Sequence, residues 1–189
     1  MRVPWSNRKK ALIIVDVQPG FLTVRNKYIV ERIQTLIKSA KYDFFVESIF
    51  HAEKNSLWDK QTDWYLPKDE NFKTVPEIAS AIVGKDCIQI KKETKSVFKG
   101  KPDLLAELKK RDIEEVHLVG VDANDCVLAT AYESFDFGFF TYVIEECAES
   151  SSSEAMREVG LAALRHVNLT NNFCVEKINF LELSLLYVG

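Results

Sequence analysis

The sequence has few of the residues that build metal clusters and disulfide frameworks. Its 189 residues include only three histidines and four cysteines. The cysteines are far apart and form no C-x-x-C pair: Cys87, Cys126, Cys147 and Cys174. Such a pattern is typical of reduced thiols in a cytoplasmic protein. We therefore expect a cytoplasmic location, with neither a disulfide framework nor a zinc cluster.

Long apolar runs and strong basic charge are also missing. No stretch reaches the ~18 to 20 apolar residues that a membrane helix requires. The opening residues, MRVPWSNRKK, lack the apolar core of a signal peptide. The formal net charge is −3, and the one basic cluster, KKETK at 91–95, is short and contains an acid. We expect no membrane or nucleic-acid partner.

The composition is that of a globular protein. Hydrophobic residues make up 47% of the chain and charged residues 28%, which is too apolar for a disordered chain. No internal repeat and no linker-like segment interrupts it. A chain of this length suits a single domain, 1–189, with a sizeable core.

Short apolar runs alternate with helical patterns. Strands are predicted at 11–17, 44–50, 87–92, 116–121, 139–145 and 167–169, and helices at 27–41, 75–83, 102–111, from 126 onward and at 154–164. This alternation predicts an α/β fold, a three-layer α-β-α arrangement with a mostly parallel, Rossmann-like central sheet of about six strands. Ligands of such sheets bind outside the carboxyl ends of the strands. The apolar tail, 173–188, is expected to pack on the body or on a partner subunit.

The stretch 116–137 is the strongest candidate for chemistry, because a strand leads through a tight polar turn into a helix. Asn124 is expected to cap that helix, which would bury Val127, Ala131 and Phe135 on one face. The first turn of the helix holds Cys126, where free N–H groups and the helix dipole would lower the pKa of a thiol and could stabilise an oxyanion. The alternative is an ordinary core cysteine.

Two more polar residues fall at strand ends. Asp16 closes the first apolar run, where a charge is costly unless it is functional or caps the turn that follows at Gln18. Alternation along 87–92 places Lys92 on the same face as Ile90, although a long lysine can also snorkel from such a position. In a parallel sheet, Asp16, Lys92 and Cys126 would all lie at the crevice.

The segment 51–66, HAEKNSLWDKQTDWYL, lacks a clear period and is rich in aromatic residues. It is expected to form a long functional loop or lid. His51, Asn55, Trp58 and Trp64 could line a substrate pocket. The alternative is that the tryptophans pack the loop onto the body.

Four motifs resemble those of the isochorismatase-like cysteine hydrolases, the family that includes nicotinamidases and N-carbamoylsarcosine amidohydrolases. LIIVDVQPGF matches the strand that ends in D-x-Q, and KETKSVF matches the strand lysine with its following loop. GVDANDCVLATA matches the cysteine motif with Ala123 in place of the usual threonine, and YVIEECAESSS matches a later segment. The resemblance extends roughly from Lys10 to Thr170.

The resemblance implies roles for the matching residues. Cys126 would be the nucleophile, Asp16 the base that takes its proton, and Lys92 the group that balances charge between them. Family members carry a cis peptide that corresponds here to Val121–Asp122, and the N–H groups of Asp122 and Cys126 would form an oxyanion hole. The implied reaction is hydrolysis of a small non-peptide amide through a thioester acyl-enzyme.

Substrate contacts are expected from six residues: Gln18, Phe21, Asn55, Trp58, Phe98 and Tyr132. Nicotinamidases of the family hold a metal through a D-x-H pair and a further histidine, but His51 has no such partner in the sequence. Because a catalytic zinc needs about three protein ligands, we expect no metal and no other cofactor.

The partner is expected to be a small-molecule substrate, and the resemblance favours a homo-oligomer, a dimer or larger. Two other functions remain open. One is a vinyl-ether hydrolase like isochorismatase itself, although that branch generally lacks the cysteine found at Cys126. The other is a catalytically silent member of the fold that binds a metabolite.

Overall fold

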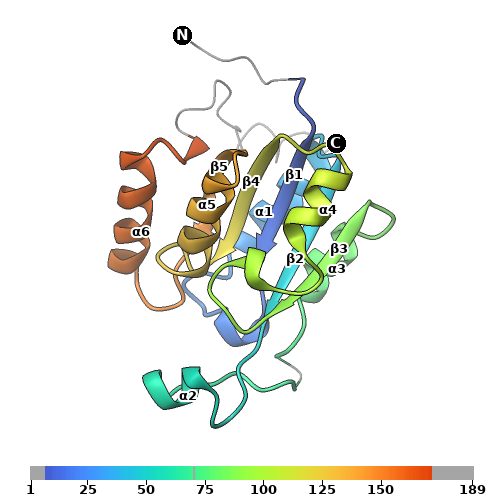
Figure 1. Ribbon diagram of the computed structural model, residues 1–189. Helices are drawn as coiled ribbons and strands as arrows, with labels where there is room; N and C mark the ends of the chain where they lie inside the picture. The colour runs from blue at the N-terminus through green and yellow to red at the C-terminus, as the bar shows by residue number, and fades with distance from the viewer. Residues whose placement is uncertain (1–6, 70, 172–189) are drawn as a thin grey trace, which may run out of the picture.

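The computed structural model describes residues 7–69 and 71–171, which build a parallel sheet flanked by helices (Figure 1). The sheet strands are β1 (Lys10–Val15), β2 (Phe44–Phe50), β3 (Cys87–Lys92), β4 (Glu115–Val121) and β5 (Phe140–Glu149). They pair in the order β3-β2-β1-β4-β5, and every pairing is parallel. The α/β fold with a parallel central sheet is therefore confirmed.

The described sheet has five strands, because the strand predicted at 167–169 does not join it. Thr170 makes only an isolated parallel bridge to Val143. Val167 instead caps the C-terminus of the preceding helix. The tail at 173–188 and Cys174 lie outside the described residues.

Helices cover both faces of the sheet (Figure 1). One face carries α1 (Ile29–Ser39) and α3 (Pro76–Ala81), and the other carries α4 (Leu104–Lys110), α5 (Cys126–Asp136) and α6 (Glu154–His166). The central strand β1 is buried along its whole length, since Leu12 and Ile14 face the α1 side and Ala11, Ile13 and Val15 face the α5 side. The sequence of a strand that is buried on both faces is a continuous apolar run.

Helix α5 begins differently from the sequence-based expectation. Its N-cap is Asp125 rather than Asn124, and the Asp125 side chain makes no capping hydrogen bond. Val127 and Ala131 are buried as expected, whereas Phe135 is 58% exposed. The tight turn before the helix, not a side-chain cap, thus sets where α5 starts.

Two glycines allow the close approach that shapes this turn. Gly120 has a φ of +115°, and a Cβ there would lie 2.1 Å from the carbonyl oxygen of Val15. A Cβ on Gly160 would lie 2.3 Å from the carbonyl oxygen of Ala123. The end of β4 therefore presses against the end of β1, and α6 presses against the turn.

The strand order changes direction between β1 and β4, because β2 and β3 are added on one side of β1 and β4 and β5 on the other. Ligands of doubly wound sheets bind at this switch point. The long segment after β2 extends beyond the same end of the sheet (Figure 1), where it forms α2 (Leu57–Thr62) and a bridge between Ala52 and Leu66. Ser56 caps α2 by accepting a hydrogen bond from the Asp59 amide, 3.3 Å away.

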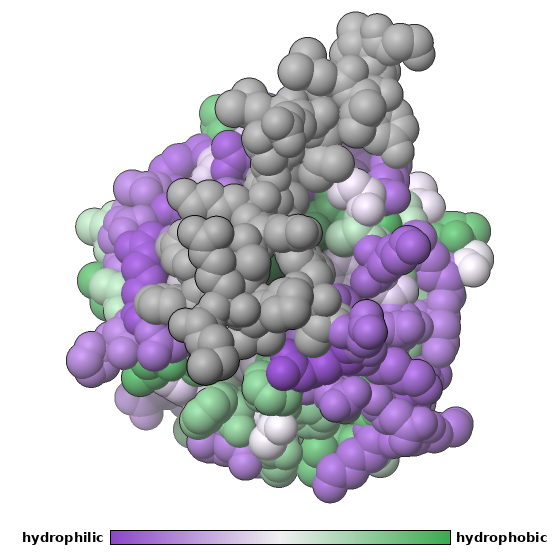
Figure 2. All heavy atoms as spheres, turned by 90° about the horizontal axis from the view of Figure 1, so that it is seen from above, coloured by the Kyte–Doolittle hydropathy of each residue, from purple (hydrophilic) through white to green (hydrophobic). Residues whose placement is uncertain are grey.

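The opposite end of the molecule is seen in Figure 2, where most of the coloured residues are hydrophilic and hydrophobic residues appear in separate patches between them. In the described part of the chain, no helix is both long and apolar enough to span a membrane.

Candidate active site

Three side chains meet where the strands of the sheet have their carboxyl ends. The Lys92 amine lies 2.6 Å from the Asp16 carboxylate and 3.5 Å from the Cys126 sulfur. Asp16 directly follows β1, Lys92 ends β3, and Cys126 opens α5 after β4. The fold thus brings together the three residues that the strand pattern and the motifs had singled out.

Hydrogen bonds hold the side chains of Lys92 and Asp16 in place. The Lys92 amine also donates to the carbonyl oxygen of Thr94 at 2.9 Å, so each of its three protons has an acceptor. The Ser48 hydroxyl donates to Asp16 at 2.6 Å and accepts from the Asp16 amide at 3.2 Å. Asp16 adopts a left-handed backbone with a φ of +51°, a conformation that non-glycine residues adopt at a cost.

Burial and charge act in opposite directions on Lys92. Burial alone would lower the pKa of Lys92, but the neighbouring Asp16 carboxylate and Cys126 sulfur outweigh that effect, and the pKa is raised. The side chain of Lys92 is 0% exposed, so the amine is a fixed positive charge beside the sulfur. Such a buried pair is retained only where its geometry is good.

The thiol of Cys126 does not behave as its helix position alone suggested. Burial and the Asp16 carboxylate raise the pKa of Cys126, and Lys92 lowers it by less. The expectation of a lowered pKa is therefore wrong, because burial and the Asp16 carboxylate together outweigh the Lys92 ammonium. A thiol whose pKa is raised needs a base to take its proton before the sulfur can attack.

The turn between β4 and α5 offers free donors next to the sulfur. The Val121–Asp122 peptide is cis. The carbonyl of Asp122 accepts the amides of Asp125 and Val127 at 2.9 and 3.0 Å. The backbone N–H groups of Asp122 and Cys126 donate no hydrogen bond to any described residue. Both N–H groups can thus serve a ligand.

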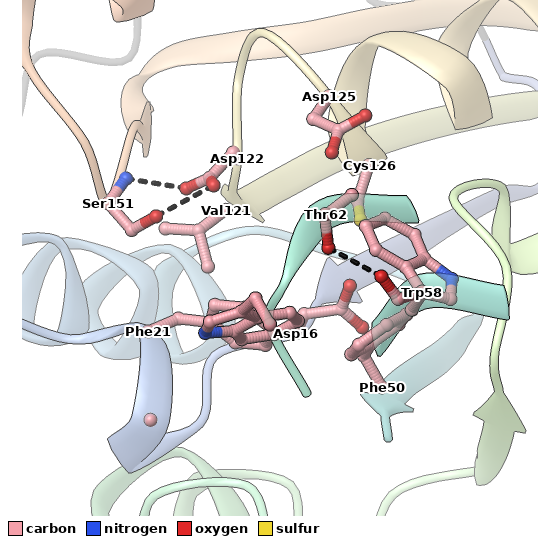
Figure 3. A pocket seen from close by; sticks show the side chains of 12 residues that line it. Asp16, Phe21, Phe50, Trp58, Thr62, Val121, Asp122, Asp125, Cys126 and Ser151 are labelled. Atoms are coloured by element: carbon pink, nitrogen blue, oxygen red, sulfur yellow. Dashed lines mark hydrogen bonds between the residues drawn. The ribbon is translucent and has the colours of Figure 1, made fainter. Parts of the chain in front are cut away.

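A cavity of about 300 Å³ opens above this group of residues. Its lining comes from both sides of the β1–β4 crevice and from the segment after β2: Asp16, Gly20, Phe21, Phe50, Trp58, Thr62, Trp64, Val121, Asp122, Asp125, Cys126 and Ser151. Figure 3 shows Asp122, Asp125 and Cys126 on the upper side of the view and Phe21 and Phe50 on the lower side. A cavity of this size suits a small molecule.

One wall of the cavity is aromatic. The Phe50 ring stacks on Trp64 at a centroid distance of 5.9 Å and meets Trp58 edge-on at 5.0 Å, while Phe21 lies 5.8 Å from Trp64. Trp58 is fixed by its indole N–H, which donates to the Glu93 carbonyl at 2.7 Å. The tryptophans therefore do both things that were considered, since they pack the segment onto the body and line the cavity.

Four of the six residues expected to contact substrate lie outside this cavity. The Gln18 amide is fully buried and bonds to the backbone of Phe50 and Asn71. Phe98 packs against the rings of Phe137 and Phe139. Asn55 is exposed on the segment after β2, and Tyr132 is exposed on α5. Phe21 and Trp58 line the cavity as expected.

Several lining residues were not anticipated. Phe50 is the last residue of β2 and points into the crevice, and Asp125 and Ser151 come from turns for which the sequence analysis gave these two residues no role. Ser48, which holds Asp16, was also missed. The sequence pattern could have indicated Ser48, because strand alternation places Ser48 and Phe50 on the same face near the end of the strand.

The described residues do not fit a metal site. The described residues contain no group of three or more His, Cys, Asp or Glu side chains that could hold a metal ion. The ring of His51 packs edge-on against Phe72, and its Nε2 lies 2.9 Å from Glu93. His117 lies within β4 and His166 at the end of α6, so neither can complete a site with His51.

Known proteins share this architecture. The chain is 27% identical over 164 residues to the uncharacterized isochorismatase family protein PncA of Bacillus subtilis (strain 168), covering 77% of this chain and 89% of that protein. Two crystal structures superpose with TM-scores of 0.71. The pyrazinamidase of Pyrococcus horikoshii in complex with zinc is 20% identical and covers 86% of this chain and 97% of its own.

The other structure is N-carbamoylsarcosine amidase from Thermoplasma acidophilum, which is 19% identical and covers 86% of this chain and 94% of its own. At such identities the structures share the fold. The sequence model of the Isochorismatase domain matches residues 10–173, which is most of the chain. This protein therefore belongs to the isochorismatase family.

Proposed function

We propose that this protein is a hydrolase that cleaves a small non-peptide amide through a thioester on Cys126, without a metal ion. One observation carries the proposal: the Lys92 amine contacts both the Asp16 carboxylate at 2.6 Å and the Cys126 sulfur at 3.5 Å beneath a cavity. An acid, an amine and a thiol at such distances form a nucleophile with its base. The amidases among the structural relatives point to the same class of substrate.

The first half of the reaction forms the acyl-enzyme. Asp16 takes the proton of the Cys126 thiol, and the sulfur attacks the amide carbonyl carbon. The N–H groups of Asp122 and Cys126 receive the developing oxyanion, and one such donor is worth on the order of 3 kcal/mol in the barrier. Asp16 then gives its proton to the leaving nitrogen, the C–N bond breaks, and ammonia or an amine departs.

The second half returns the enzyme to its starting state. Water attacks the thioester carbonyl and passes a proton to Asp16. The sulfur leaves as the tetrahedral intermediate collapses, and Asp16 returns the proton to it. Lys92 keeps its positive charge throughout and stabilises whichever of its two neighbours is anionic. The product is a carboxylic acid.

The test is ammonia release from a panel of small amides by purified protein. Cys126→Ala is expected to lower the rate by a factor of about 10³ or more, because the covalent step is removed. Cys87→Ala, a matched change at a thiol that starts β3 away from the cavity, is expected to keep the wild-type rate. Full turnover by Cys126→Ala would refute the thioester route.

A second measurement addresses the metal. Turnover is expected to be unchanged after dialysis against a chelator, since the described residues offer no three-ligand site. Loss of activity on chelation that is restored by added zinc would contradict a metal-independent reaction. A mass increase matching the acyl group, trapped on Cys126 by rapid acid quench, would identify the intermediate directly.

A further inference from the structure

The cavity has carboxylates in its lining but no cationic side chain. Asp16, Asp122 and Asp125 all line it. Asp16 is neutralised by Lys92, and Asp125 forms an ion pair with Lys95. No lysine, arginine or histidine of residues 7–69 and 71–171 makes an ion pair with Asp122. Asp122 is therefore the lining carboxylate that no cationic side chain of these residues compensates.

Two hydrogen bonds from Ser151 hold the Asp122 carboxylate at the cavity. The Ser151 hydroxyl donates to one carboxylate oxygen at 2.7 Å, and the Ser151 amide donates to the other oxygen (Figure 3). Burial raises the pKa of Asp122 despite these bonds, and the charges of Asp125 and Asp16 raise it further. A cation in the cavity would offset both effects.

The aromatic wall suits a cation as well. The faces of Trp, Tyr and Phe rings attract ammonium groups. The chain already seats two of its own ammonium groups on this wall, with the Lys92 amine 5.0 Å from the centroid of Phe50 and the Lys95 amine 4.7 Å from that of Trp58. Lys95, between Trp58 and Asp125, and Lys92, over Phe50, thus fill two places on this wall. No lysine or arginine of the described residues lies over the rings of Phe21 or Trp64, so that part of the wall can take the ammonium of a ligand.

We propose that the substrate is a small amide that carries an ammonium group. The ammonium lies between the Asp122 carboxylate and the rings of Phe21 and Trp64, and the amide carbonyl lies over the sulfur of Cys126. This assignment rests on the proposed function, because the amide is placed by the same cavity. It adds the charge of the substrate, which the motifs do not specify.

The test compares ligands of equal shape and different charge. Trimethylammonioacetamide and 3,3-dimethylbutanamide differ only in a nitrogen that replaces a carbon, and malonamate supplies a negative charge. Calorimetric titration of the Cys126→Ala protein measures binding without turnover, and Cys126→Ser provides the same comparison if the alanine variant does not fold. The cationic amide is expected to bind about 10-fold tighter than its neutral isostere, with malonamate weakest.

Asp122→Asn tests the source of the preference, because asparagine can keep both bonds to Ser151 while losing the charge. The preference for the cationic amide is expected to fall to about 3-fold or less. Asp136→Asn removes the same charge from an exposed position at the end of α5 and is expected to keep the full preference.

Equal binding of the cationic and neutral amides, or tighter binding of malonamate, would overturn the inference. So would a full preference in Asp122→Asn. The two proposals fail separately. A wild-type protein that binds the cationic amide selectively but releases ammonia from no amide would refute the hydrolase, whereas rapid hydrolysis of neutral or anionic amides in preference to the cationic one would refute only the substrate assignment.

Discussion

Two buried networks of charge lie at opposite ends of the same sheet. At the carboxyl end, the side chains of Asp16 and Lys92 are 1% and 0% exposed and lie 2.6 Å apart. At the amino end, those of Glu115 and His117 are 6% and 1% exposed and lie 2.8 Å apart. By burial and pairing, the two networks are nearly equivalent.

Their surroundings differ. The Asp16 network borders a cavity and includes the sulfur of Cys126. Around the Glu115 network, the rings of Tyr42 and Tyr142 pack edge-on against the His117 imidazole at centroid distances of 5.4 and 5.9 Å. A buried charge is therefore weak evidence of function by itself. A nucleophile and room for a ligand beside the charge make the stronger case.

The largest expected effect comes from exchanging one carboxylate in each network for an amide. Asp16→Asn should lower kcat/KM for amide hydrolysis by a factor of about 10² to 10⁴, because the base is lost. Glu115→Gln should leave kcat/KM within about 2-fold, because Glu115 lies at the other end of the sheet and acts only on stability. Ammonia release measures both.

The proposed difference between the two networks would be wrong if Glu115→Gln lost as much activity as Asp16→Asn while circular dichroism showed that the Glu115→Gln protein was folded. In that case the two networks would be linked through β1 and β4, which pair along their length. Equal activity of Asp16→Asn and the wild-type protein would instead remove Asp16 from the proposed mechanism.

A smaller effect is expected from removing one amine in each network. Lys92→Met leaves the Asp16 carboxylate buried with a hydroxyl and without its cation, and should lower the free energy of unfolding by about 3 kcal/mol. Lys10→Met should cost on the order of 1 kcal/mol, because Glu115 keeps Arg8 at 3.3 Å and His117 at 2.8 Å.

Urea denaturation of the two variants measures this difference directly. Equal losses would mean that the Asp16 network is no more dependent on its amine than the Glu115 network is. A gain in stability for Lys92→Met would show that the buried charges are kept at a cost to folding, as functional sites often are.

Much of this geometry could be predicted from local patterns. The strands Phe44–Phe50 and Cys87–Lys92 were placed to the residue, because turn residues bound short apolar runs there. Alternation put Lys92 on the buried face, and burial of Ile90 and Lys92 with exposure of Gln89 and Lys91 confirms it. Parallel strands bring their carboxyl ends to one edge, so the meeting of Asp16, Lys92 and Cys126 followed from topology.

The rest depends on tertiary contacts that no local pattern contains. Ser48, on β2, bonds to Asp16 at the end of the neighbouring strand β1. Ser151, just after β5, bonds to Asp122. The pKa of Cys126 was expected to fall because the sequence places it at a helix start, but burial by neighbouring segments raises it. Gln18, which belongs to a motif, bonds to the backbone of Phe50 instead of lining the cavity.

The smallest effect concerns pH and the Glu115 network. Burial lowers the pKa of His117 below its ordinary value, although Glu115 opposes this. Below about pH 6.5 the unfolded chain takes up a proton that the folded protein binds less readily, so the unfolding free energy should fall as the pH decreases. For one group the slope is at most about 1.4 kcal/mol per pH unit.

His117→Gln should flatten this slope, whereas His166→Gln, at an exposed position that ends α6, should leave it unchanged. Urea denaturation between pH 5 and 8 separates the variants, since the carboxylates titrate alike in both. An identical slope in His117→Gln and the wild-type protein would mean that Glu115 offsets the burial completely. The Glu115 network would then resemble the Asp16 network, where a carboxylate keeps its buried cationic partner charged.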